Sequence, residues 1–192
     1  MGKLSLVFPH PGIYEVLLGT AGVAENISPI GIRVSDDFRI RVYSGSLTLQ
    51  NLSIHPYCLL LITQDPVLFF KGLSGQLSPE RWVYGLPAIN GMSCIFVAKC
   101  KLTALGNPSE FLLSFISEMG ECKEKSLSRG DGLFVDLLVH ITRVDIVSKD
   151  ERDKLFEIIK YETEVIRRTA PYLEPFLKRI EDSLRSKGYK LE

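Results

Sequence analysis

Hydrophobic and polar residues alternate through much of the first half of the chain, as they do in half-buried β-strands. The clearest case is SPIGIRVSDDFRIRVYS (28–44), where the apolar residues at 30, 32 and 34 share one face and those at 38, 40 and 42 continue it. Between them, Asp36 and Asp37 are typical of a turn rather than of a metal-binding pair. This stretch is predicted to be a β-hairpin.

Further apolar runs of strand length surround the hairpin. They are GIYEVLLGTAG (12–22), YCLLLIT (57–63), PVLFFKG (66–72) and MSCIFVAKCKLTALG (92–106). SLTLQNLSIHP (46–56) is too mixed for a strand, and we expect a short helix that ends at Pro56. Six or so strands with one short helix predict a β-barrel rather than a parallel α/β sheet.

The second half carries apolar residues at helical spacing. NPSEFLLSFISEMG (107–120) has Asn107 at an N-cap position, Pro108 at the first helical position and Glu110 three residues past the cap. LFVDLLVHITRV (133–144) has a helical stripe, Ser148 and Glu151 form a capping box, and Pro171 separates the last two helices. We therefore predict an α+β chain with a barrel core at 1–106 and a helical extension at 107–192, packed on the barrel or on a partner subunit.

Charge and cysteine content narrow the function classes. Lys and Arg together number 23, as do Asp and Glu, so no global field attracts nucleic acid or an anionic membrane. No apolar run approaches the ~20 residues of a membrane span, and no signal peptide is evident. The four cysteines (Cys58, Cys94, Cys100 and Cys122) lack C-x-x-C spacing, so we expect no metal site but free, buried thiols in a cytoplasmic protein.

Positive groups nevertheless gather on one face of the hairpin. Alternation places Gly31, Arg33, Arg41 and Tyr43 opposite the apolar face, and Arg39 joins them. GSLT (45–48) follows directly and begins a helix, whose first amides lack internal partners. Guanidinium groups, free amides and hydroxyls together form a phosphate cradle. The alternative is an exposed, arginine-rich hairpin face, with Ser46 serving only as a helix cap.

Several short motifs occur here in the order typical of a known superfamily. Asn26, Pro29, Ile30 and Gly31 lie in one strand and Arg41 in the next, and Gly45, Ser46 and Thr48 open a helix that ends near Pro56. This region resembles the FMN-binding split-barrel superfamily of flavin reductases and pyridoxamine-phosphate oxidases. It is most similar to an uncharacterised archaeal family within it (domain of unknown function 447), as are LLVHITRV (137–144) and the terminal helices. Thr48 stands where the oxidase branch has a phosphate-binding lysine.

The resemblance implies a homodimer with FMN near the subunit interface. Ser46, Thr48 and one or both of Arg33 and Arg41 would hold the phosphate, and the backbone of Ile30, Gly31, Ile32 and Arg33 would meet the flavin ring. Tyr43 and Asn51 complete the candidate cofactor-binding set.

The implied activity is that of a flavin-reductase-like oxidoreductase, with a nicotinamide nucleotide as candidate electron donor and no catalytic side chain identified. Two alternatives stay open. One is a non-catalytic FMN binder or chaperone, and the other is a barrel that binds a phosphate ligand without flavin.

Overall fold

The computed structural model describes residues 2–189 and divides the chain into two compact units. The barrel unit contains the chain up to Pro9 and Tyr14–Leu127, and the helical unit contains His10–Ile13 and the chain from Ser128 onward. None of the helices in residues 2–189 is both long and apolar enough to cross a membrane.

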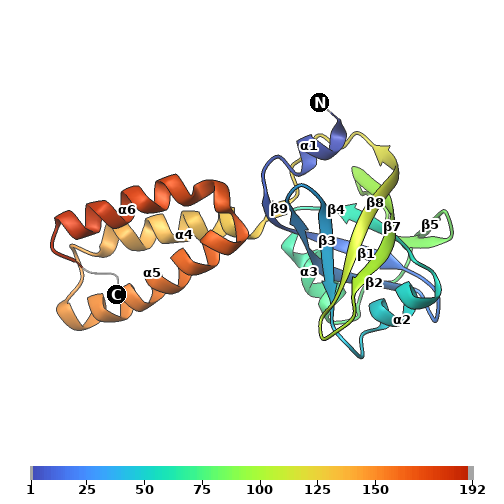
Figure 1. Cartoon of the computed structure of the whole chain (residues 1–192), viewed down its shortest axis with the longest axis horizontal. Coiled ribbons are helices and arrows are strands. Elements are labelled where there is room, and N and C mark those ends of the chain that lie inside the picture. Colours follow the sequence, from blue (N-terminus) through green and yellow to red (C-terminus); the bar gives the residue numbers. More distant parts are fainter. Residues whose placement is uncertain (1, 190–192) are drawn as a thin grey trace. The chain divides into compact units, whose positions relative to one another are not determined.

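Six strands close the barrel unit into a barrel, as the sequence predicted (Figure 1). The sheet order is β2-β3-β8-β7-β4-β1-β9, and an additional pairing of β1 with β2 closes the circle. The barrel strands are β1 (Gly12–Thr20), β2 (Asn26–Val34), β3 (Phe38–Val42), β4 (Tyr57–Ile62), β7 (Cys94–Ala104) and β8 (Ser109–Gly120). The remaining elements of this part of the chain are β9 (Leu127–Ser128), the hairpin of β5 (Arg81–Val83) and β6 (Leu86–Ala88), and helices α1 (Lys3–Val7), α2 (Leu47–Ile54) and α3 (Pro66–Leu73).

The hydrophobic residues alternate in β2 and β3 but run continuously in β4, and two apolar clusters explain the difference. Ile32 on β2 pairs with Ile40 on β3, and both are buried inside the barrel, while Arg33 and Arg41 face outward. The predicted hairpin is therefore confirmed. Strand β4 is apolar on both faces because its outer face is covered as well: a second cluster joins the outer sides of β1, β4 and β7 to residues of α3 and the β5–β6 hairpin.

The β5–β6 hairpin lies against β1 at one glycine. A Cβ atom built on Gly19 would lie 2.2 Å from the carbonyl oxygen of Pro87 in β6. Only a residue without a side chain fits this contact, so Gly19 sets how closely the hairpin approaches the barrel.

Two predicted elements are wrong. Residues 109–120 form strand β8, not a helix, because this segment pairs with β3 on one side and β7 on the other, and those ladders outweigh the cap-like local sequence. Asn107 caps no helix; its side chain accepts a hydrogen bond from the Ser44 amide at 3.1 Å. Conversely, 66–73 is helix α3 rather than a strand. Asp65 caps it by accepting from the Val67 amide at 2.8 Å, and Pro66 occupies the first turn.

The helical unit begins at Ser128, not at residue 107. It contains α4 (Arg129–Arg143), α5 (Lys149–Thr169), a 3₁₀ turn η1 (Pro171–Leu173) and α6 (Glu174–Ser186), which confirm the helices predicted there (Figure 1). The capping box of Ser148 and Glu151 is present at the start of α5. The apolar stripes meet in one core that includes Leu137, Ile159 and Leu177.

The cysteines differ from the expectation of four free thiols. Cys94 and Cys122 form a disulfide, and only Cys58 and Cys100 are free. The chain reverses after β8, which brings Cys122 beside the start of β7, where the Cys122 amide donates to the Ser93 carbonyl at 3.4 Å. Cys94 and Cys122 are therefore not the free thiols that the sequence predicted. A hydrogen bond with Cys100 and burial raise the pKa of the Cys58 thiol well above its usual value.

Candidate functional site

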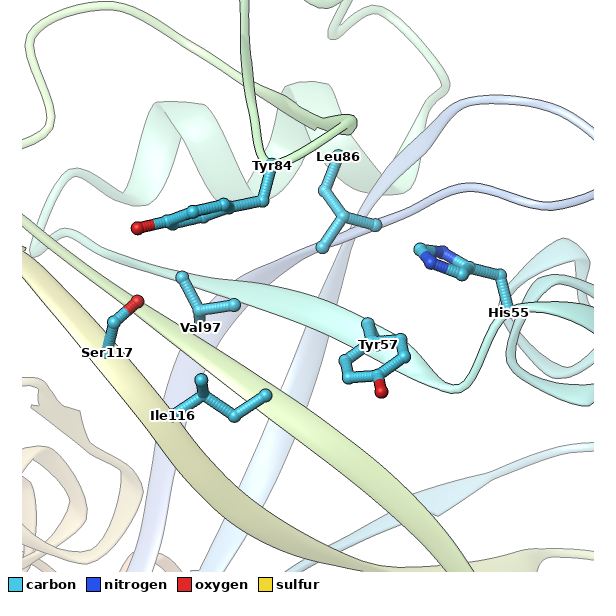
Figure 2. Close-up of a pocket in the computed structure, with 7 residues that line it drawn as sticks. All are labelled: His55, Tyr57, Tyr84, Leu86, Val97, Ile116 and Ser117. Atoms are coloured by element: carbon cyan, nitrogen blue, oxygen red, sulfur yellow. The ribbon is translucent and has the colours of Figure 1, made fainter.

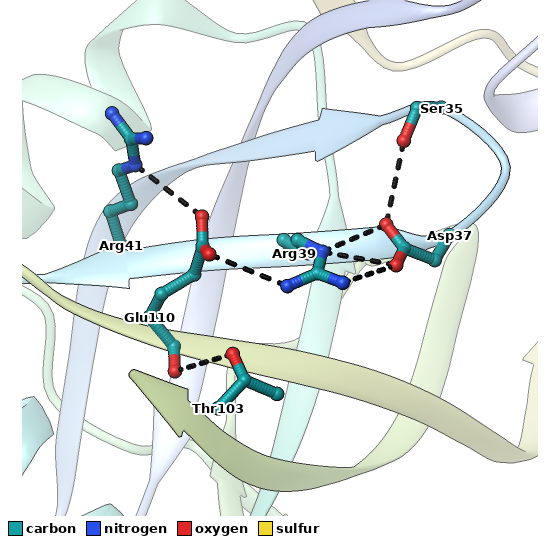
Figure 3. Close-up of polar contacts among 6 residues, drawn as sticks. All are labelled: Ser35, Asp37, Arg39, Arg41, Thr103 and Glu110. Atoms are coloured by element: carbon teal, nitrogen blue, oxygen red, sulfur yellow. Dashed lines mark hydrogen bonds and ion pairs between the residues drawn. The ribbon is translucent and has the colours of Figure 1, made fainter. Parts of the chain in front are cut away.

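The outward face of β2 and β3 carries the predicted arginines, but it also carries carboxylates. Arg39 is held by Asp37, whose oxygens accept from its Nε at 3.0 Å and from its Nη2 at 2.7 Å (Figure 3). The hydrogen bond from Arg39 lowers the pKa of the Asp37 carboxyl and raises that of Arg39 itself. Arg39 is therefore committed to a protein carboxylate.

Glu110 is the group that sequence reasoning missed, because it was assigned to a helix. On β8 it lies opposite Arg41, and its carboxylate contacts Arg39 Nη1 at 3.3 Å and Arg41 Nε at 3.5 Å. Figure 3 shows the terminal nitrogens of Arg41 directed away from Glu110. Three arginines (Arg33, Arg39 and Arg41) against two carboxylates (Asp37 and Glu110) leave one net positive charge. Of the three arginines, Arg41 lies nearest to the start of the following helix along the chain, and its side chain is 54% exposed.

Helix α2 begins beside the end of β3. Ser46 caps it: its Oγ accepts from the Leu49 amide at 3.3 Å and donates to the Tyr43 carbonyl at 2.7 Å. The amides of Leu47 and Thr48 are the first two of the helix and have no intrahelical acceptor. Ser46 is thus a cap, as the alternative interpretation stated, and the amides beside it are donors suited to an anion.

Thr48 turns inward rather than toward this helix start. Its hydroxyl lies 2.9 Å from Asn26 Nδ2 and 3.0 Å from Ser28 Oγ, and the residue is buried. Asn26 belongs to the motif on which the resemblance rested, so the structure ties the strand motif to the helix motif through this contact.

The Asn51 side chain is fully buried, and four hydrogen bonds join it to the protein. Its amide oxygen accepts from the amides of Val23 and Ala24, and its amide nitrogen donates to Thr20 Oγ1 and the Ala24 carbonyl. An asparagine side chain can make about four such bonds. Asn51 therefore holds the turn between β1 and β2.

The proposed ring-binding segment offers mainly its backbone. Ile32 points into the barrel core, whereas Ile30 and Gly31 are half-buried and Arg33 is exposed. Tyr43, at the end of β3, is 64% exposed. The structure thus brings Arg41, Tyr43 and Ser46 close along the chain at one strand-to-helix junction and places Asn51 in the interior behind it.

A pocket of about 300 Å³ lies elsewhere on the outer face of the barrel, and the sequence did not predict it. Figure 2 shows its walls, which come from the end of α2, from β4, β7 and β8, and from the β5–β6 hairpin. The lining residues are His55, Tyr57, Tyr84, Leu86, Val97, Ile116 and Ser117. His55 thus borders a cavity, while Trp82, on the same hairpin as Tyr84, is 54% exposed and is not among the lining residues.

Among the described residues of the helical unit, a compact group of polar side chains surrounds a buried carboxylate. Glu162 is 3% exposed, and its two oxygens lie 3.0 and 3.1 Å from His140 Nδ1. Asp136 completes a group of three whose ligand atoms lie within 4.8 Å of one another. Glu162 is thus buried in hydrogen-bonding contact with the His140 imidazole.

Solved structures place the barrel in a recognised class. The FMN-bound protein MM1853 from Methanosarcina mazei matches with a TM-score of 0.57 at 21% identity, over 92% of this chain and 97% of that one. An FMN-binding protein from Thermus thermophilus matches with a TM-score of 0.47 at 14% identity over 60% of this chain and 75% of that one. The NADH:FAD oxidoreductase SgcE6 of Streptomyces globisporus matches with a TM-score of 0.48 at 18% identity over 62% and 76%. The barrel has the predicted split-barrel fold, with C-terminal helices added.

Family models then identify the chain. Residues 14–119 match the N-terminal domain, and residues 128–185 the second domain, of the protein family of unknown function DUF447. The chain belongs to this family, as the sequence resemblance indicated. Among proteins with curated functions, none matches it.

Proposed function

We propose that the protein is a flavoprotein that binds FMN and passes electrons through it. The observation that carries this proposal is the junction of β3 and α2. There the free end of the Arg41 guanidinium and the first amides of α2, which have no intrahelical acceptor, lie within a few residues of one another. This donor set fits a phosphate monoester, which offers only acceptor oxygens.

Each candidate residue has a revised role in this proposal. Arg41 binds the phosphate as a cation, with Arg33 as the second candidate, and Leu47 and Thr48 donate their backbone amides. Ser46 positions those amides by capping the helix, and Asn51 supports the turn behind them. The backbone around Gly31, which lacks a side chain, is where the flavin ring meets the protein. Bound flavin supplies the electron-accepting ring, while the protein supplies binding and orientation.

The homodimer, the nicotinamide donor and the cytoplasmic location belong to the same proposal. The likeness to an FMN-bound protein over almost the full length of both chains supports FMN as the ligand, whereas the dimer and the nicotinamide donor rest on the sequence resemblance. Light scattering that finds a monomer at micromolar concentration with flavin still bound would contradict the dimer.

The central test is FMN affinity of the purified chain and its Arg41→Ala variant. Loss of one charge-assisted contact, about 1.5–3 kcal/mol, should weaken FMN roughly ten- to a hundredfold. Lys123→Ala removes an exposed cation beyond the far end of β8 and should change nothing. Riboflavin lacks the phosphate, so its binding should be weak and indifferent to Arg41→Ala; equal losses for both flavins would show that Arg41 does not contact phosphate.

A second measurement separates the alternatives. Anaerobic mixing of the FMN-loaded protein with NADH or NADPH should bleach the flavin absorbance within the time of mixing if the protein is an oxidoreductase. A loaded protein that no reductant bleaches would be a flavin carrier, and a chain that cannot retain FMN on gel filtration would be a barrel for another phosphate ligand.

A further inference from the structure

The pocket on the outer face of the barrel lies far along β8 from the phosphate-binding junction. Glu110, beside Arg41, and Ser117, in the pocket, are seven residues apart on this strand, which corresponds to about 23 Å at the usual rise per residue. A ligand in the pocket is thus distinct from a phosphate held at Arg41 of the same chain.

The pocket is apolar at its floor and aromatic at its ends. Val97 and Leu86 form apolar surface in the middle, Tyr84 closes one end, and Tyr57 with His55 closes the other (Figure 2). The rings of His55 and Tyr57 lie with centroids 5.2 Å apart. No Asp, Glu, Lys or Arg side chain is among the residues described as lining it. Such a surface suits a planar, uncharged ring.

Tyr84 occupies an unfavourable backbone conformation. It has φ of +52°, and Gly85, which follows, has φ of +76°, so the two residues form the tight turn between Val83 and Leu86. Such a turn favours Asn-Gly, and a bulky side chain at its first position is strained. Tyr84 is also 74% exposed, so core packing does not compensate for the strain. A ligand beneath the ring would.

Ser117 presents a hydroxyl with no partner. Its Oγ is buried and makes no hydrogen bond with any residue that the structure describes. Ser117 lies opposite Val97 on β7, and Figure 2 shows the oxygen directed to the side of the pocket where Tyr84 lies. A buried hydroxyl left unpaired destabilises a protein, and a carbonyl or amide group on a ligand would satisfy it.

We infer that this pocket is a second binding site, for a small planar aromatic group that carries one carbonyl or carboxamide substituent. The ring lies on Val97 and Leu86 beneath Tyr84, and the substituent hydrogen-bonds with the Ser117 hydroxyl. The site uses none of the residues assigned to the phosphate, and His55 at its edge is the C-cap of the helix whose first amides are assigned to it.

Benzamide is the probe, measured by NMR titration against the full chain with and without FMN. Cyclohexanecarboxamide has the same polar group without a planar ring, and toluene has the ring without the polar group. Both should bind more weakly than benzamide. NAD⁺, titrated separately, should bind more weakly than benzamide, because its oxidised nicotinamide ring is positively charged and no acidic side chain is among the lining residues.

Two variants test the assigned contacts. Ser117→Ala and Tyr84→Asn should each weaken benzamide about two- to tenfold, as expected for one hydrogen bond or one aromatic contact. Both should also raise the melting temperature of the free protein, because one removes an unpaired hydroxyl and the other relieves the strained turn. Ser114→Ala, at an exposed position of the same strand, is the matched control and should do neither.

Three results would overturn the inference. Benzamide that binds no better than cyclohexanecarboxamide would remove the aromatic site. Variants indistinguishable from Ser114→Ala would remove the two contacts. Displacement of benzamide by FMN would make the pocket part of the flavin site. A failure of FMN binding, in contrast, would leave the first two readouts unchanged.

Discussion

The barrel unit and the helical unit differ in how they use their polar side chains. In the helical unit several charged groups bond to one another: Arg167 bonds to Glu174 at 3.0 Å and to Glu181 at 2.6 Å, and His140 bonds to the buried Glu162. In the barrel unit, polar groups are left with unused capacity, namely the terminal nitrogens of Arg41, the first amides of α2 and the Ser117 hydroxyl.

This difference indicates where ligands bind. A side chain whose hydrogen bonds are complete within the protein contributes to stability, whereas one held in place with an unmet donor or acceptor is available to a ligand. Mutations in the helical unit should therefore act on stability, and those at the unused groups of the barrel on binding.

The largest effect that we expect is a loss of stability from a mutation inside the barrel unit, where the unused polar groups would suggest an effect on binding. Asn51→Ala removes four hydrogen bonds from a fully buried side chain and should cost about 3 kcal/mol of unfolding free energy. Chemical denaturation of the flavin-free protein measures this, with the exposed neighbour Gln50→Ala as control. Unchanged stability together with weaker FMN binding would instead make Asn51 a ligand residue, as the sequence suggested.

In the helical unit, the buried pair should matter more than an exposed one. His140→Ala leaves the Glu162 carboxylate buried and unpaired, so it should cost about 2–3 kcal/mol, somewhat below the value for a fully buried pair because the imidazole is partly exposed. Arg185→Ala breaks the exposed pair with Asp182 and should cost less than about 1 kcal/mol. Circular dichroism melts of both variants test this order, and equal losses would refute it.

Two serine caps differ only in whether a ligand is assigned to the amides beside them. Ser148 caps α5 and Ser46 caps α2, and replacing either by alanine should cost about 1 kcal/mol. The variants should differ with FMN present, since only Ser46→Ala disturbs amides assigned to the phosphate. FMN titration of both measures the difference. Equal FMN affinities would reduce Ser46 to a cap alone.

The smallest effect concerns pH. Because Arg39 holds the pKa of Asp37 below its ordinary value of 3.8, the Asp37 carboxylate contributes stability above that pH, and the contribution is lost as the pH falls through the lowered value. In Arg39→Gln the Asp37 pKa, followed by carboxyl NMR, should rise toward 3.8. A pKa that stays low in this variant would show that Arg39 is not the cause.

Local patterns were sufficient where one stretch of chain determines its own structure. The alternation at 28–44 predicted the hairpin, and caps with apolar stripes predicted α4, α5 and α6. They failed where distant partners decide. The cap-like residues before β8 favour a helix locally, but two neighbouring strands supply its hydrogen bonds.

The candidate site divides in the same way. Arg41 and Ser46 are close in sequence and could be predicted, whereas Glu110 reaches Arg41 only through strand pairing. Cys94 and Cys122 are separated by 28 residues, and the pocket around Ser117 gathers residues from several segments. No local spacing encodes either arrangement.

Gly19 affects how the results of saturation mutagenesis are interpreted, because positions that tolerate no substitution are commonly assigned to function. Since even a methyl group there would collide with the Pro87 carbonyl, every substitution must push the β5–β6 hairpin away from β1, and Tyr84 with it. In a saturation library selected for ligand binding, position 19 should accept glycine alone, as strictly as a catalytic residue would. The invariance of glycine at this position would result from the close contact between two backbones, although the position touches no ligand.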